Sequence, residues 1–346
     1  RDSCRTCRTN IEAKHYCVAL PGENAECVCA GLRTVFEHIG AVPLTLVLDN
    51  ATGAGHRVAW DRVSIVKVFE LFVEHYRLET RFCNPNSGNE KGSVENAVGF
   101  LRRNIMVPLL NAESYAQLTR YMLERCDAMA KETHYRKGAP IGGLFAEEKA
   151  EMQPLPSKPY DAIRWEVRKA DKDGRVQVDG NHYLAGPSWR GWTLDVALRA
   201  FDVTIRTQDG RTCARLPRVY GDSPATIRDP ATLLPALGRK TNAWPDSTIR
   251  DDFPDKLRLA IDRMDAKARR NAFRLISRTS DACGFEPAVE AGEHLVEQGH
   301  PLDEASLTTM ARRIASGEKP YEQTAPDLTG YDVFMQPRGT RERKEA

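Results

Sequence analysis

The stretch "LTLVLDN", residues 44–50, has the pattern of a strand at the centre of an α/β sheet. Residues 44–48 are apolar except for one threonine, as in a strand that is buried on both faces. The stretch ends in Asp49 and Asn50, so a carboxylate follows the carboxyl end of the predicted strand. Sites in open α/β folds usually form at that edge of the sheet. We therefore take Asp49 as a candidate site residue.

The segments around this strand alternate between strand and helix patterns. "HYCVAL" (15–20) predicts a strand, and residues 23–40 carry apolar residues at helical spacing. After "LTLVLDN", a glycine-containing loop precedes a helix predicted over about 61–75 and a short strand predicted over 77–82. The alternation indicates an α/β core.

A second candidate carboxylate lies in "NPNSGNEKGSVENAVGFLRRN", residues 84–104. The first half is rich in Asn, Pro and Gly and predicts a loop, whereas the second half predicts an amphipathic helix. The apolar stripe of this helix consists of Val94, Val98, Leu101 and Ile105. Glu95 lies off the centre of that stripe and shares its face with Lys91 and Arg102.

Asp49 and Glu95 are separated by 46 residues and come from different predicted elements. Carboxylates that converge in this way can hold one or two divalent metal ions, which activate a water or a DNA 3′ hydroxyl for phosphoryl transfer. Lys91, Arg102 and Arg103 would then contact DNA phosphates. The alternative is that Asp49 is a turn residue and that Glu95 is a solvated partner of a lysine.

These stretches resemble a known family. "VPLTLVLDN" (42–50), the 46-residue spacing and residues 84–104 are similar to the integrase core of IstA-type transposases. Such transposases are DDE enzymes of the retroviral-integrase kind, from insertion sequences that also encode an IstB helper ATPase. The resemblance continues through "KGAPIGGLFAEEKAEMQPLP" (137–156) and "VQVDGNHYLAGP" (176–187), and it covers roughly residues 14–222.

The resemblance implies a fold, an activity and partners. The fold would be α/β, with an RNase H-like integrase core, and the activity would be metal-dependent cleavage and transfer of DNA 3′ ends. Asp49 and Glu95 would be the second and third acids of the triad and ligands of Mg²⁺ or Mn²⁺, with Asn50 near the site. The implied partners are element-end and target DNA, an IstB-type AAA+ ATPase helper, and further copies of the chain on DNA.

The sequence departs from the family pattern at its amino end. The first acid of such a core lies on the opening strand, whereas "HYCVAL" takes the place of the third strand. Residues 1–13 are rich in Arg and Cys, and their pattern does not predict a sheet. We therefore expect a truncated chain that lacks the first catalytic Asp and the helix-turn-helix region before it. Two functions stay open: a transposase that cleaves and joins DNA, whose activity depends on whether the first Asp is present, or a truncated non-catalytic module that binds DNA or full-length subunits and interferes with transposition.

After the core, expected over 14–157, the pattern changes. A helix is predicted over 111–135 and a Gly- and Pro-punctuated connector over 137–157. Residues 158–222 alternate with period 2 and contain three Asp-Gly turns, which predicts a small β-barrel. In similar transposases this part contacts DNA, so Arg164 and Arg168 are candidate phosphate contacts. The pattern favours packing over DNA contact for Trp189 and Trp192.

The last part of the chain predicts helices and a tail. Residues 223–318 contain a linker and amphipathic helices, one predicted over 255–278 and another beginning after Asp303. These helices have three possible roles: binding the helper ATPase, binding a second subunit, or packing on one another. Residues 319–346 have the composition of a disordered segment.

The overall composition fits a globular protein of two or three domains, with 346 residues, of which 41% are hydrophobic and 28% charged. No long apolar run or signal-peptide pattern is present, so we expect a cytoplasmic, nucleoid-associated bacterial protein without a membrane partner. The nine cysteines are odd in number and scattered, which predicts reduced thiols. A net charge of +2 neither requires nor opposes nucleic-acid binding.

Overall fold

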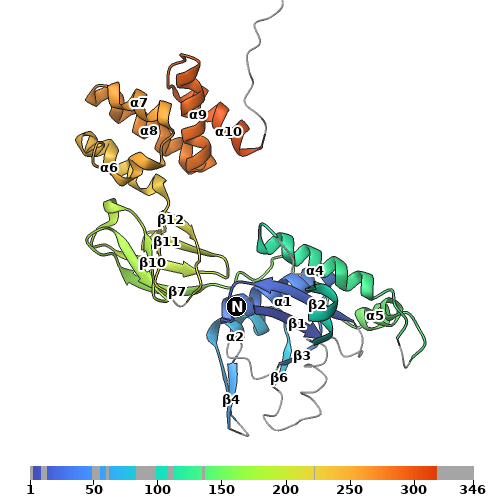
Figure 1. Ribbon diagram of the computed structural model, residues 1–346. Coiled ribbons are helices and arrows are strands. Elements are labelled where there is room, and N and C mark those ends of the chain that lie inside the picture. Colours follow the sequence, from blue (N-terminus) through green and yellow to red (C-terminus); the bar gives the residue numbers. More distant parts are fainter. Residues whose placement is uncertain are drawn as a thin grey trace, which may run out of the picture. The chain divides into compact units, whose positions relative to one another are not determined.

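The computed structural model describes residues 3–8, 14–48, 55–59, 62–82, 99–107, 112–134, 137–221 and 223–317, of which 3–8, 55–59 and 62–65 are described by their backbone only. The chain divides into two compact units, Arg1–Thr232 and Leu233–Ala346, here called the first and second units (Figure 1). No helix in the described ranges is both long and apolar enough to cross a membrane.

The α/β region of the first unit is organised around the helix α1 (Ala25–Ile39). One face of α1 packs with the strand pair β1 (Ser3–Arg8) and β2 (His15–Leu20), and β2 also packs with α4 (Tyr115–Met129). Its other face packs with α2 (Lys67–His75) and with partly buried residues of β3 (Thr45–Leu48). Strand β3 pairs in parallel with β6 (Glu79–Phe82). This mixed α/β architecture is the fold class that the sequence predicts (Figure 1).

Helix α1 begins and ends where the sequence predicts. The Asn24 side chain caps it by accepting a hydrogen bond from the Cys27 N–H at 3.0 Å. Gly40 ends it in the left-handed conformation, with φ at 74°, and donates its N–H to the carbonyl of Phe36. The predicted strand over 77–82 and the predicted helix over 111–135 are likewise present, as β6 and α4.

Two segments of the α/β region correct the sequence-based expectations. Residues 3–8 form β1, although their composition does not predict a sheet; they pair antiparallel with β2 from Ser3 opposite Leu20 to Arg8 opposite His15. Pairing is decided by the main chain of the buried strand β2, whose N–H and C=O groups require partners whatever the facing side chains are. The helix predicted from about residue 61 begins only at Lys67, because residues 62–65 form a strand instead.

That strand, β5 (Arg62–Ile65), forms a hairpin with β4 (Gly55–Ala59) in place of the expected loop. Val63 and Ile65 are β-branched and alternate, a pattern that suits a strand better than the first turn of a helix. The expected connector over 137–157 also contains a helix, α5 (Ile141–Ala150). Its Leu, Ala, Glu and Lys residues are good helix formers, and they outweigh the two glycines in its first turn.

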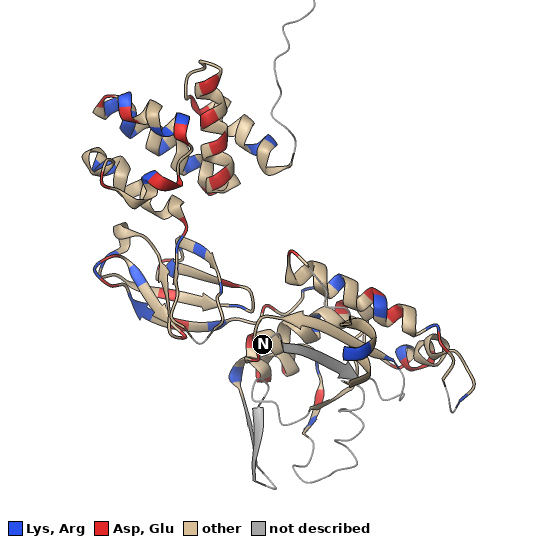
Figure 2. Ribbon diagram, in the orientation of Figure 1, with Lys and Arg blue, Asp and Glu red and all other residues tan. Residues whose placement is uncertain are grey.

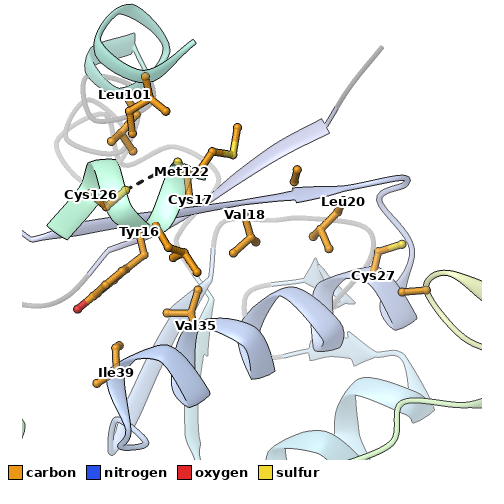
Figure 3. Packing of buried hydrophobic residues seen from close by; sticks show 14 of the residues in the cluster. Tyr16, Cys17, Val18, Leu20, Cys27, Val35, Ile39, Leu101, Met122 and Cys126 are labelled. Carbon is orange, nitrogen blue, oxygen red and sulfur yellow. Dashed lines mark hydrogen bonds between the residues drawn. The ribbon is translucent and has the colours of Figure 1, made fainter. Parts of the chain in front are cut away.

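The buried cluster between β2 and α4 also includes the short helix over residues 99–105 (Figure 3). Leu101 and Ile105 are 3% and 2% exposed, which confirms this half of the predicted apolar stripe. The Cys17 and Cys126 sulfur atoms lie 3.9 Å apart in the same cluster. All cysteines in the described part of the chain for which side chains are given are free thiols, as the scattered spacing predicts.

The all-β region of the first unit is built from two sheets. The first sheet contains β7 (Arg164–Lys169), β10 (Thr193–Leu198), β11 (Asp202–Thr207) and β12 (Thr212–Pro217), in the order β12-β11-β10-β7. The second contains β8 (Arg175–Val178), β9 (Asn181–Leu184) and β13 (Thr226–Ile227). Both sheets bury their apolar residues in one shared cluster.

The alternation over residues 158–222 therefore corresponds to strands, as predicted, but they do not form the predicted small β-barrel as a closed sheet. Among the described residues, no hydrogen-bonded strand pair joins the two sheets. The Asp-Gly turn between β8 and β9 has positive φ at both central residues, 48° at Asp179 and 80° at Gly180, as a two-residue hairpin turn requires.

A tyrosine joins the all-β region to α1. The hydroxyl of Tyr220 donates to the carbonyl of Ala200 at 2.8 Å and accepts a hydrogen bond from the Asn24 side chain at 3.4 Å. Its ring lies over Gly22, where a β-carbon would come within 2.5 Å of the ring atom Cε1. Only a glycine at this position lets the chain pass beneath the ring.

The second unit is helical. It contains α6 (Leu234–Arg239), α7 (Asp255–Arg263), α8 (Ala266–Cys283), α9 (Phe285–Glu297) and α10 (Glu304–Ala315). The single helix predicted over 255–278 is two helices, because Asp265 caps a new one by accepting from the Ala268 N–H at 2.7 Å. The predicted cap at Asp303 is confirmed, since its carboxylate accepts from the Ser306 N–H at 2.9 Å.

Candidate active site

The candidate active site lies at the carboxyl edge of the parallel strand pair β3 and β6. Their register places Leu48 opposite Phe82, so both strands end at the same edge. Asp49 and Asn50 follow Leu48 directly in the sequence and lie outside the described residues. In open α/β folds this edge is where sites form.

Strand β3 is less buried than its sequence predicts. On β3, Val47 is 59% exposed, whereas Leu46 and Leu48, on the other face, pack against the cluster shared by α1 and α2. The expectation of burial on both faces is therefore wrong for the described strand, because the helices that the structure describes, α1 and α2, pack against one of its faces. Within the described ranges, β6 is the strand that pairs with β3.

The helix over residues 99–105 presents cations on the side opposite its core contacts. Arg102 and Arg103 are exposed, while Leu101 and Ile105 are buried in the cluster with Cys17 and Cys126 (Figure 3). As exposed side chains, the two arginines are accessible to a phosphate. Lys91 and Glu95 lie outside the described residues, so their position relative to Asp49 stays a prediction.

Metal-ligating residues do not cluster in the part of the chain that the structure describes. No group of three or more His, Cys, Asp or Glu side chains there could hold a metal ion. Both proposed ligands, Asp49 and Glu95, belong to the remaining residues. Two carboxylates are nevertheless the oxygen donors that Mg²⁺ and Mn²⁺ favour.

Arg164 is held in an ion cluster rather than left free at the surface. Its Nε donates to Glu26 Oε1 at 2.8 Å, and its Nη2 donates to Asp179 Oδ2 at 2.7 Å. It also pairs with Glu166. Burial alone would lower the pKa of the Arg164 guanidinium, but its hydrogen bonds and ion pairs with Asp179 and Glu26 outweigh that effect and raise the pKa.

Arg218 completes this cluster. Its side chain is 2% exposed, and its Nη2 donates to Asp179 Oδ2 at 2.8 Å. Its Nη1 lies 3.7 Å from Glu26 Oε2. Glu26 comes from α1 and is 1% exposed, so the Glu26 cluster (Glu26, Arg164, Asp179 and Arg218) ties the α/β region to the all-β region. Sequence reasoning did not find Glu26 or Arg218, because nothing local marks a buried carboxylate on an amphipathic helix.

Strand β7 exposes its apolar side chains and turns a charged side chain inward, the reverse of an ordinary half-buried strand. Trp165 and Val167 are 48% and 59% exposed, while Glu166 lies inward with its side chain only 14% exposed. The guanidinium of Arg206, on β11, lies 4.2 Å from the centre of the Trp165 ring. Arg168 is exposed at the end of the strand, 2.5 Å from Glu166. Sequence reasoning did not find the Trp165–Arg206 pair, because the alternation in "RWEVRK" favours burial of Trp165 and because Arg206 lies on another strand.

Trp189 and Trp192 pack on each other. Their ring centres are 5.3 Å apart in an edge-to-face arrangement, and Trp189 also contacts the core of the all-β region. Trp192 is 52% exposed. The packing role that the sequence favours is confirmed for Trp189.

Comparison with known proteins shows that the chain is similar to transposases. Residues 155–229 match the family model described as Mu transposase, C-terminal domain. The chain is 28% identical over 192 residues to the transposase for insertion sequences IS1326/IS1353 of Pseudomonas aeruginosa, a match that covers 55% of this chain and 38% of that protein.

Two further relatives agree with this match. The chain is 27% identical over 191 residues to the transposase for insertion sequence element IS21 of Pseudomonas aeruginosa, covering 55% of this chain and 49% of that protein. It is 28% identical over 230 residues to a transposase of Aminobacter aminovorans, covering 64% and 45%. The chain thus spans less than half the length of these relatives. Over these residues the chain is similar to transposases of the IS21 type.

Proposed function

We propose that the chain carries part of an RNase H-like integrase core that transfers DNA 3′ ends, with Asp49 and Glu95 as two of its catalytic acids. The observation that carries the proposal is the parallel pairing of β3 and β6, whose carboxyl ends share one edge. Asp49 is the next residue after β3, and the loop that leads to Glu95 follows β6. Both acids therefore belong to segments that leave the same edge.

The roles of the chain's own residues follow from their chemistry. Asp49 and Glu95 would hold Mg²⁺ or Mn²⁺, with Asn50 beside them. A divalent ion held there would supply Lewis-acid stabilisation of the charge that develops on a phosphodiester during transfer. Lys91, Arg102 and Arg103 would bind the phosphates on either side of the reacting bond and keep it in line.

The all-β region would bind DNA next to the core. Arg168, exposed at the end of β7, and the Trp165–Arg206 pair offer the charge and the aromatic surface that nucleic acids bind. Arg164 would serve this surface indirectly, because its bonds to Glu26 and Asp179 hold β7 in place. Assembly of several copies on DNA and a helper ATPase of the IstB type are further parts of the proposal, and these rest on the family resemblance.

A strand-transfer assay with labelled element-end DNA and Mg²⁺ or Mn²⁺ tests the proposal. It compares this chain with a version extended by the in-frame coding sequence before Arg1, since the family triad contains a further acid. In the active version, Asp49→Asn and Glu95→Gln should each lower the rate by about 10³-fold or more while DNA affinity stays within about twofold.

The matched control is Glu79→Gln, an exposed carboxylate on β6 that pairs with Arg81. It should leave the transfer rate unchanged. Unchanged transfer in Asp49→Asn would contradict the assignment of that acid. Normal DNA binding without transfer in either version would instead identify a non-catalytic binding module.

A further inference from the structure

Two helices of the second unit are each dominated by charges of one sign, α8 by cations and α9 by carboxylates. Figure 2 shows acidic residues along α9, basic residues along α8 and residues of both signs on α7 (Asp255–Arg263). On α8, exposed cations recur at intervals of three, four and four residues, which places them in one row along the helix. This row, here called the α8 ridge, consists of Lys267, Arg270, Arg274 and Arg278. It lies on the side of α8 opposite the buried Phe273 and Ile276.

Other cations of this unit are held by hydrogen bonds or ion pairs within the unit. Arg269 donates to the main-chain oxygens of Ile261 and Met264, at 3.2 and 3.1 Å, and so satisfies the carboxyl end of α7. Arg250 pairs with Asp262 at 2.5 Å, and Lys256 pairs with Glu297 at 2.5 Å. These bonds explain why cations stand at those positions.

In the described part of the chain, the cations of the α8 ridge make no comparable stabilising bonds. Arg278 lies 3.6 Å from Glu304, with both side chains more than 60% exposed, a kind of pair that adds little to stability. Across the described ranges, no ion pair joins Lys267, Arg270 or Arg274 to a carboxylate. Like charges three and four residues apart instead destabilise a helix by a few tenths of a kcal/mol per pair. A bound polyanion would remove that cost.

The length of the ridge suits an extended ligand. Its four cations span about 16 Å of helix axis, with neighbouring β-carbons about 5–6 Å apart. The end of α6 lies next to the ridge, because a β-carbon built on Gly238 would be 3.8 Å from Cγ of Arg274. Exposed Arg239 and Lys240 follow Gly238 directly. Duplex DNA carries one charge per about 1.7 Å of its axis, so several phosphates fall within this length.

We propose that the α8 ridge binds the phosphate backbone of duplex DNA without reading its sequence. The inference rests on the proposed function for the choice of DNA as partner, and it gives the helical unit a DNA-binding surface separate from the candidate active site. The acidic face of α9 on a second copy is a weaker candidate partner. Lys256 already pairs with Glu297 and donates its main-chain N–H to Glu293 at 3.2 Å, which partly neutralises that face.

The test is a fluorescence-anisotropy titration of the full chain with a random-sequence duplex, without divalent metal, over a series of salt concentrations. The double variant Arg270→Gln/Arg274→Gln should weaken binding about tenfold or more and reduce the slope of log affinity against log salt by about 2, since each phosphate contact contributes about 0.9. Arg270→Lys/Arg274→Lys keeps both charges and should retain the slope. Lys256→Gln/Arg312→Gln removes two charges elsewhere in the unit and should also retain it.

An unchanged slope in Arg270→Gln/Arg274→Gln, or an equal fall in the Lys256→Gln/Arg312→Gln control, would overturn the proposal. A changed sedimentation coefficient with an unchanged slope would overturn it in favour of contact between copies. Thermal melting of each variant verifies that the second unit is folded. Because no metal is added, failure of strand transfer with a normal slope would count against the proposed function alone, whereas loss of all duplex binding by the unmodified chain would count against both.

Discussion

Asp179 is both a turn residue and an ion-pair partner. Burial would raise the pKa of its carboxyl, but the hydrogen bond from Arg164 and the charges of Arg164 and Arg218 outweigh burial and lower it. A lowered pKa in the folded state stabilises the protein above the ordinary Asp value of about 4, and this contribution is lost as pH falls through the folded-state pKa. Acid should therefore weaken the Glu26 cluster.

Asp179→Asn tests this linkage. Asparagine tolerates the positive φ of the turn, so the change removes the charge and keeps the backbone. We expect the free energy of unfolding to fall by about 1 kcal/mol at pH 7, a modest value because solvent screens a carboxylate that is 41% exposed. Urea unfolding should show the gap between the two proteins closing below about pH 4. A gap that stays constant with pH would rule out the ion pairs as its cause.

At the scale of elements, β7 illustrates what local sequence can and cannot predict. The period-2 alternation and the Asp-Gly turns suffice to position the strands of the all-β region, because both signals are local. They cannot predict that Arg164 lies inward, because its partner Glu26 is 138 residues away in the sequence. The same limit applies to β1, which is a strand because β2 pairs with it.

For the candidate site, too, the sequence predicts the local elements but not how they come together. The parallel strand that precedes Asp49 and the buried residues Leu101 and Ile105 follow from periodicity and are confirmed. Convergence of Asp49 with Glu95 depends on the path of the loop that begins after β6, and spacing along the chain does not determine that path. The break between α7 and α8 was missed because the apolar stripe passes through it, although Asp265 is a good cap residue.

Loss of Glu26 from α1 should affect both regions of the first unit. Glu26→Gln leaves Arg164 and the buried Arg218 short of a negative charge, and we expect the free energy of unfolding to fall by about 3 kcal/mol. Urea denaturation provides the measurement. Glu37→Gln, on the same helix and in an exposed pair with Arg33, should cost less than about 0.5 kcal/mol. Equal effects of the two changes would show that Glu26 has no special role.

At the scale of the whole molecule, the second unit has its own aromatic core. Trp244 is fully buried, with its ring centre 5.1 Å from those of Phe253 and Phe273, and its Nε1 donates to Asp262 at 2.7 Å. Trp244→Phe removes this hydrogen bond and leaves a small cavity, at a cost of about 2 kcal/mol. Calorimetry should resolve two transitions, and the substitution should lower one of them by about 10 °C.

Trp192→Phe is the matched control for the first unit. Its ring is 52% exposed, so the same change should shift neither transition by more than about 2 °C. A single transition that is lowered as a whole in Trp244→Phe would mean that the two units unfold as one cooperative body.

The contact between Gly22 and Tyr220 has a consequence for how this family varies. Because a β-carbon at residue 22 would lie 2.5 Å from the ring, a mutation there is tolerated only after the ring has been replaced by something smaller. Mutation of Tyr220 alone, by contrast, opens space and loses the hydroxyl's bond to Ala200. The order of the two substitutions therefore matters, and an evolving lineage should pass through a smaller residue at 220 before it accepts any side chain at 22.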